Sequence, residues 1–168
     1  EEGWREYFDL NVPEFMFEAD NLNSEAVAQY SFIEKVELDS ERTEVREHYL
    51  IVLMEEKDSI ADYSVDVNAE IQSYLENAIS TIRKGERTES LIILSESAEV
   101  EEVNGIPALR AEMLAEIDHH SGTVELYYQL GVYEGKRAFY QVVTWCLGGQ
   151  KDLFKVDMEK ILDSFQEK

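Results

Sequence analysis

The side chains best suited to chemistry gather at Asp118, His119 and His120. Adjacent imidazoles beside a carboxylate are a composition that suits borderline divalent metals. Neighbouring residues on a strand point to opposite faces, however, and Ser121-Gly122 marks a turn between two strands. We therefore expect a solvated hairpin tip with no bound metal or cofactor. The alternative is a metal-dependent, hydrolase-like enzyme that uses Asp118, His119 and nearby carboxylates.

Two acidic runs, Glu55-Glu56-Lys57-Asp58 and Glu99-Val100-Glu101-Glu102, offer the hard oxygen ligands that calcium prefers. Neither run has the glycine-turned loop with alternating ligands that makes a calcium signal specific, so we predict weak cation binding at most. The sequence also has no glycine-rich phosphate loop, no serine nucleophile elbow, no Cys-x-x-Cys and no His-Glu-x-x-His. The sequence thus favours a protein that is not an enzyme.

Two further reactive residues have structural interpretations. His48 lies in a predicted strand between Glu47 and Tyr49, where a hydrogen-bonded structural histidine is favoured over a general base. Cys146 lies in the apolar run 142–147, which favours a small buried hydrophobic residue over a nucleophile. Because it is the single cysteine of the chain, no internal disulfide can form.

Aromatic residues concentrate in the last two predicted strands. In the strand 124–132, Tyr127 and Gln129 share one face with Tyr133, which follows directly. The neighbouring strand adds either the alternating set with Tyr140 or the set with Trp145. Because amphipathic rings are enriched where proteins bind, we predict that these five residues form a recognition face for a protein partner or small ligand. The simpler interpretation is that a helix covers this face and the phenol groups reach its rim.

Hydropathy periods predict the elements that position these residues. In the predicted strands, apolar residues recur at every second position. In the predicted helices, apolar residues recur three and four positions apart. Asn104-Gly105 and Gly135 mark tight hairpins, Gly135 through a positive φ. An aromatic segment from Trp4 to Pro13 reads as an opening strand that the proline ends. The predicted strands are 28–38, 45–54, 91–103, 106–117, 124–132 and 138–147, and the predicted helices are 67–82 and 154–165.

The order of these elements is strands, a helix, a meander of strands and a helix. Each element has one apolar face to bury, so a largely antiparallel sheet with helices packed on it is the natural solution. The chain has 168 residues, 44% of them hydrophobic, which is enough for one well-buried core. We predict a single domain over residues 1–168 of the α/β class, more closely the α+β type.

The charge of the chain limits its partners. There are 37 acidic and 15 basic residues, for a formal net charge of -22, and the acids are spread along the chain. Such a surface repels phosphate, which argues against nucleic acids and anionic membranes and leaves cationic partners, divalent cations and solubility at high salt open. No apolar run of membrane-spanning length occurs. The start at Glu1 without methionine leads us to expect a removed leader or a trimmed chain.

Several phrases of the sequence resemble the superfamily that joins the PsbP extrinsic proteins of photosystem II, the Mog-type Ran-binding proteins and bacterial envelope proteins of unknown function. They are the aromatic segment ending at Pro13, Asn104-Gly105-Ile106-Pro107-Ala108, Tyr127-Tyr128, Tyr140 and Ile161-Leu162-Asp163-Ser164-Phe165. The resemblance implies a three-layer α/β/α sandwich and a non-catalytic accessory or binding role. It also implies export, frequently as a lipoprotein whose lipid-bearing cysteine lies upstream of this chain.

These observations predict a non-enzymatic accessory or binding protein of the cell envelope. We expect it in the periplasm or outside the cell, with a lipid anchor upstream of the chain, and the alternative location is the cytoplasm. We expect a monomer or weak homodimer that presents an aromatic and acidic face to a protein or small ligand. A purely structural subunit is the third interpretation, which a large exposed apolar patch would support.

Overall fold

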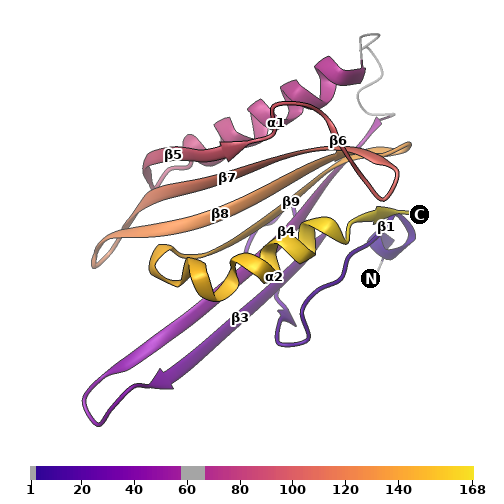
Figure 1. The fold of residues 1–168 in the computed structure, drawn as a ribbon. Helices are drawn as coiled ribbons and strands as arrows, with labels where there is room; N and C mark the ends of the chain where they lie inside the picture. Colours follow the sequence, from indigo (N-terminus) through magenta and orange to yellow (C-terminus); the bar gives the residue numbers. More distant parts are fainter. Residues whose placement is uncertain (1–2, 58–66) are drawn as a thin grey trace.

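A computed structural model describes residues 3–57 and 67–168, with the side chains of 70–168 in the second range (Figure 1). Within these residues two α-helices form, α1 (Val67–Arg83) and α2 (Lys151–Asp163), with the short 3-10 helices η1 (Gly3–Glu6) and η3 (Gly148–Gln150). The strands are β1 (Phe8–Asp9), β2 (Phe17–Glu18), β3 (Ala28–Glu37), β4 (Thr43–Glu56), β5 (Thr88–Glu96), β6 (Glu101–Val103), β7 (Ile106–His119), β8 (Gly122–Glu134), β9 (Ala138–Leu147) and β10 (Gln166–Glu167).

The main sheet is antiparallel throughout, as expected. Its strands follow the order β2-β3-β4-β9-β8-β7-β5, and the short β6 pairs with β7. The hairpin of β3 and β4 is long and projects beyond the neighbouring strands (Figure 1). A separate pair joins β1 to β10, which brings the two ends of the chain side by side.

The two helices bury their apolar stripes against different residues of this sheet. α1 packs Ile71 and Leu75 against odd-numbered residues of β7 and even-numbered residues of β8, such as Met113 and Leu130. α2 packs Phe154 and Met158 against the alternate set. Because successive strand residues point to opposite faces, α1 and α2 lie on opposite faces of the sheet. Burial of each large side chain contributes about 1.5–3 kcal/mol to these contacts.

Most of the predicted elements are confirmed, and the hairpin at Asn104-Gly105 is among them. Both residues have positive φ angles, 49° and 81°, which is the backbone shape of a tight two-residue hairpin. Gly135 differs from the prediction, because it does not lie in the left-handed region. Its lack of a side chain serves close packing instead, since a Cβ atom there would collide with Glu167 and meet a ring carbon of Tyr140 at 2.8 Å.

Two predicted strands are wrong in part. The segment from Trp4 begins as the 3-10 helix η1, and only Phe8–Asp9 pairs as a strand, because its strand partner is the two-residue β10. The rings of Trp4 and Phe8 are stacked, with centroids 4.9 Å apart. Packing rather than strand pairing therefore explains the aromatic residues of this segment. The predicted strand 91–103 is divided into β5 and β6, with register shifts in β5 that interrupt its pairing with β7. No helix among the described residues is long and apolar enough to cross a bilayer.

Candidate binding face of the sheet

Four of the five predicted binding residues lie on the face that α2 covers. Tyr127, Tyr133 and Tyr140 are each 0% exposed, and Gln129 is 4% exposed. The ring of Tyr133 stacks on Phe165 with centroids 4.2 Å apart, just after α2 ends. The expectation that these residues form an accessible face is therefore corrected, because α2 and the C-terminal segment occupy the space in front of them.

The polar groups on this covered face find partners inside the protein. The Tyr133 hydroxyl donates to the carbonyl oxygen of Leu162 at 2.7 Å. The Tyr140 hydroxyl donates to Glu167 Oε1 at 3.1 Å, and Gln129 Nε2 donates to the Tyr127 hydroxyl at 3.0 Å. Burial raises the pKa of all three tyrosines, so they stay protonated at neutral pH. These contacts give the phenols structural roles.

Trp145 lies on the opposite face of the sheet from the other four predicted residues. It is an odd number of positions from Tyr140 on the same strand, so their side chains point to opposite sides. Trp145 is half-buried, and it packs at the edge of the core that α1 covers. The five residues therefore do not form one surface, and Trp145 alone points to a face that α2 leaves open.

Two tyrosines that are not among the five predicted binding residues flank Trp145. Tyr49 on β4 and Tyr128 on β8 are its register partners on either side. The ring centroids lie 5.3 Å apart for Tyr49 and Trp145 and 5.9 Å apart for Tyr128 and Trp145, both in stacked arrangement. Strand pairing thus produces a continuous row of three rings on three adjacent strands, all of them half-buried.

Exposed apolar side chains extend this row toward the edge of the sheet. Phe17 on β2 pairs with Ser31, which pairs with Tyr49, so Phe17 belongs to the same register row. Phe17 is 72% exposed, and Ile33 and Val45 on the projecting hairpin are 62% and 41% exposed. All of these side chains share the face of the sheet that carries Trp145. The open face is defined by Phe17, Ile33, Val45, Tyr49, Tyr128 and Trp145.

The open face escapes coverage because α1 is placed over the other half of the sheet. α1 lies along β5, β7 and β8, whereas the hairpin of β3 and β4 projects away from it (Figure 1). Buried residues next to the open face, such as Ile51 and Val143, belong to the core beneath α1. The open face is therefore continuous with the hydrophobic core and reaches solvent at its outer end.

Glu47 is a carboxylate of the open face. It precedes Tyr49 by two residues on β4, so both side chains point to the same side, and the Tyr49 hydroxyl donates a hydrogen bond to it. Burial, the charge of Glu47 and this hydrogen bond raise the pKa of Tyr49 to about 12. Within the described parts of the chain, no lysine, arginine or histidine lies within 4.0 Å of the Glu47 carboxylate.

The residues weighed as metal ligands do not converge. Asp118, His119 and His120 are exposed at the hairpin between β7 and β8, and His119 Nδ1 lies 3.1 Å from Ser121 Oγ. No group of three or more potential ligands forms within the described residues. Asp58 of the first acidic run lies outside those residues.

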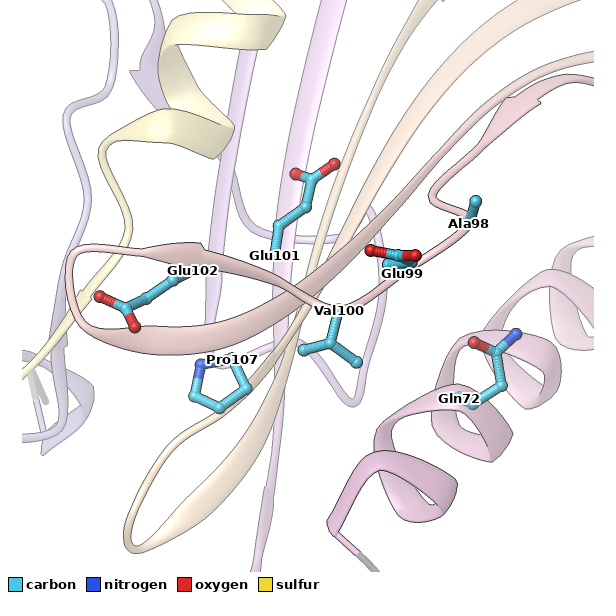
Figure 2. Close-up of a pocket in the computed structure, with 7 residues that line it drawn as sticks. All are labelled: Gln72, Ala98, Glu99, Val100, Glu101, Glu102 and Pro107. Atoms are coloured by element: carbon cyan, nitrogen blue, oxygen red, sulfur yellow. The ribbon is translucent and has the colours of Figure 1, made fainter.

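The second acidic run borders a surface cavity of 740 Å³ (Figure 2). Glu99, Glu101 and Glu102 line it with Gln72, Val100 and Pro107, among others. In Figure 2 the three carboxylates point in different directions, with Glu101 turned away from the other two. A calcium ion needs several oxygens directed to one point, and this arrangement does not supply them.

His48 and Cys146 face each other across β4 and β9 beneath α2. Both are 0% exposed, and His48 Nε2 lies 2.6 Å from Thr144 Oγ1. Burial lowers the pKa of His48 to about 4 and raises the pKa of Cys146 to about 12. Nucleophilic catalysis by a Cys-His pair needs a thiolate beside an imidazolium, whereas burial here favours the neutral form of both groups. The pair is part of the core.

An antiparallel sheet with helices on its faces, closed by paired chain ends, defines a fold of the PsbP-like class. The solution structure of cyanobacterial PsbP from Synechocystis sp. PCC 6803 is similar over 98% of this chain and 88% of its own, with a TM-score of 0.56 and 11% identity. The resemblance inferred from the sequence is thus confirmed for the fold.

Two other solved structures share this fold. LpqN, involved in cell envelope biogenesis of Mycobacterium tuberculosis, covers 95% of this chain and 82% of its own, with a TM-score of 0.53 and 10% identity. PA94 of Pseudomonas aeruginosa, a protein of unknown function and putative regulator, covers 94% of this chain and 95% of its own, with a TM-score of 0.52 and 9% identity. No protein-family model matches the chain, and neither does any curated protein.

Proposed function

We propose that this protein is a non-enzymatic accessory protein that acts outside the cytoplasm and binds a protein partner through the open face. The observation that carries the proposal is the exposure of Phe17 and Ile33, 72% and 62%, next to the ring row centred on Trp145. Grouped apolar side chains beside aromatic rings are typical of surfaces that bind other proteins.

The size of the open face favours a protein over a small ligand. Its residues come from β2, β3, β4, β9 and β8, five adjacent strands of the sheet. With about 4.8 Å between neighbouring strands, the face extends about 19 Å across the sheet. Small ligands bind in concave pockets that surround most of their surface, whereas partner proteins cover wide and flat areas.

The chemistry of the described residues supports a role without catalysis. The most reactive pair, His48 and Cys146, is buried in its neutral form. The exposed side chains of Asp118, His119 and His120 are not part of any group of three residues that could hold a metal within the described residues. The hydrolase alternative would need both a metal and an accessible cleft at that hairpin.

The comparisons support a location in the cell envelope. LpqN is involved in cell envelope biogenesis, and PsbP-like proteins share the fold. The proposed location is the periplasm or the outer side of the envelope, with the upstream lipid anchor that the resemblance implies. The proposed protein is a monomer when it is not bound to its partner, because its charge of -22 makes copies repel one another.

Site-specific photo-crosslinking in the producing cells tests the proposal. A photoreactive phenylalanine analogue is placed at Ile33 on the open face or at Ile92 on β5, which is 60% exposed and serves as the matched control. We expect one envelope protein to be crosslinked from position 33 and not from position 92. Equal crosslinking from both positions, or none from position 33, would overturn the proposal.

A further inference from the structure

The carboxylates of this sheet differ in whether the protein neutralises them. Glu112 lies 3.2 Å from Lys151 Nζ and 3.1 Å from Lys155 Nζ. Glu134 on β8 forms an ion pair with Lys57, whose Nζ atom lies 3.0 Å from Glu134 Oε1. Glu47, half-buried among the rings of the open face, has no such cation within the part of the chain that the structure describes.

Glu47 also has hydrogen-bonding capacity left. An ionised carboxylate offers about four acceptor positions, and the Tyr49 hydroxyl uses one of them. Lys35 lies on the same face, because it pairs with Val45, two residues from Glu47 on β4. No ion pair joins Lys35 to Glu47 among the described residues. A negative charge within an apolar, partly buried surface attracts a cation more strongly than one in open water does.

We propose that the open face binds a protein segment in which an arginine is flanked by apolar side chains. This inference rests on the proposed function, whose partner it describes. The arginine places its guanidinium on the Glu47 carboxylate and against the ring of Tyr49 or Trp145. The apolar neighbours of the arginine contact Ile33 and Phe17.

Arginine fits this site better than lysine for two physical reasons. Its planar guanidinium donates to a carboxylate with two parallel N–H groups, whereas an ammonium acts as a point charge. Its flat face also stacks on aromatic rings and is more weakly hydrated, so it loses less when apolar side chains surround it. Tyr49 follows Glu47 by two residues on the same face and stacks on Trp145, so the carboxylate and the ring faces lie in neighbouring register rows.

The charge of the chain argues against a second copy as the occupant. With 37 acidic residues against 15 basic ones, two copies carry a large net charge of the same sign and repel each other. A cationic segment from another protein is instead attracted by the same field. Charge complementarity therefore selects a different, basic partner.

Three blocked peptides test the inference, acetyl-Gly-Leu-X-Leu-Gly-amide with X as arginine, lysine or citrulline. Citrulline keeps the shape of arginine without its charge. Binding is followed by NMR through the assigned indole N–H of Trp145, with the indole of Trp4 as an internal reference. We expect the arginine peptide to bind about fivefold more tightly than the other two, which corresponds to about 1 kcal/mol. Raising NaCl from about 50 mM to about 500 mM should weaken binding of the arginine and lysine peptides and leave the citrulline peptide unchanged.

The variants Glu47→Gln and Glu34→Gln form the matched pair. Glu34 lies on the same hairpin as Glu47 but points to the other face, since the two occupy alternate register rows. We expect Glu47→Gln to remove the preference for arginine and Glu34→Gln to keep it. Circular dichroism confirms that both variants are folded, and the salt dependence of the native chain provides a test without any substitution.

The outcomes separate the two proposals. If position 33 crosslinks a partner but the three peptides bind equally or not at all, the arginine inference fails and the proposed function stands. If Glu34→Gln weakens arginine binding as much as Glu47→Gln does, the attraction is general and the inference fails as well. If position 33 crosslinks nothing and no peptide shifts the Trp145 signal, both fail.

Discussion

The buried histidine makes a quantitative prediction about acid stability. His48 is 0% exposed, and its Nδ1 atom has no hydrogen-bond partner within the described residues. Phe154 and Phe15 lie beside it, with ring centroids at 5.0 and 6.2 Å. Burial in this apolar environment lowers its pKa from 6.5 to about 4. The unfolded chain therefore binds a proton at a higher pH than the folded protein does.

The sign and size follow from this difference. Because the unfolded state takes up the proton first, the free energy of unfolding falls as the pH falls from about 6.5 to about 4. With an unfolded pKa of 6.5 and a folded pKa of about 4, the loss between pH 7 and pH 5 is about 2 kcal/mol. Below the folded pKa the loss reaches about 3 kcal/mol and then stays constant.

His48→Gln tests this reasoning, because glutamine keeps a polar group for Thr144 but does not titrate. We expect urea denaturation to show that the loss of stability between pH 7 and pH 5 is about 2 kcal/mol smaller in this variant than in the native protein. The control is His119→Gln, which removes an exposed histidine at the β7–β8 hairpin and should keep the full loss. A His48→Gln protein with the same pH dependence as the native chain would refute the assignment.

Three other predictions concern the two faces of the sheet. Tyr133→Phe removes the hydroxyl that donates to Leu162 and leaves a buried carbonyl oxygen unpaired, so it should lower the free energy of unfolding by about 1–2 kcal/mol in urea denaturation. Burial opposes ionisation of Glu112, but hydrogen bonds from Tyr127, Lys155 and Lys151 outweigh it and lower its pKa to about 2. Stability should therefore fall as the pH drops from 4.5 to about 2, and in Glu112→Gln this part of the loss should be absent. Ile33→Ser alters a side chain that is 62% exposed, so stability should change by less than about 0.5 kcal/mol while partner crosslinking from a photoreactive residue at Phe17 disappears.

Local patterns predict much of this fold because local physics determines those elements. The hairpin at Asn104-Gly105 forms because both residues tolerate positive φ, and the residue types alone predict this property. The stripe of α1 is confirmed for the same reason, since its apolar spacing matches the helical period. The segment after Trp4 is different, because a strand exists only where a partner strand is available and that partner is at the other end of the chain.

The candidate face depended on information that a sequence does not contain. Alternation divides each strand into two sets, but it does not say which set meets α2 and which meets solvent. The predicted group therefore joined Tyr140 to Trp145, although the sheet separates them. Tyr49 was not identified because its place beside Trp145 comes from the register between β4 and β9, which pairs residues 96 positions apart. A tertiary register of this kind leaves no local signal.

The two faces of the sheet differ in how the protein stabilises their partly buried carboxylates. Where folding places Glu112 under α2, two lysines of that helix neutralise it, because a partly buried charge without a partner would cost stability. On the open face, Glu47 accepts a hydrogen bond from the Tyr49 hydroxyl, and no ion pair to it forms among residues 3–57 and 70–168. Folding tolerates this because the outer end of that face remains in water, where a carboxylate is well solvated. A partner that excludes this water has to supply hydrogen-bond donors or a cation in its place, so under the proposal a feature that is neutral for folding becomes a requirement for binding.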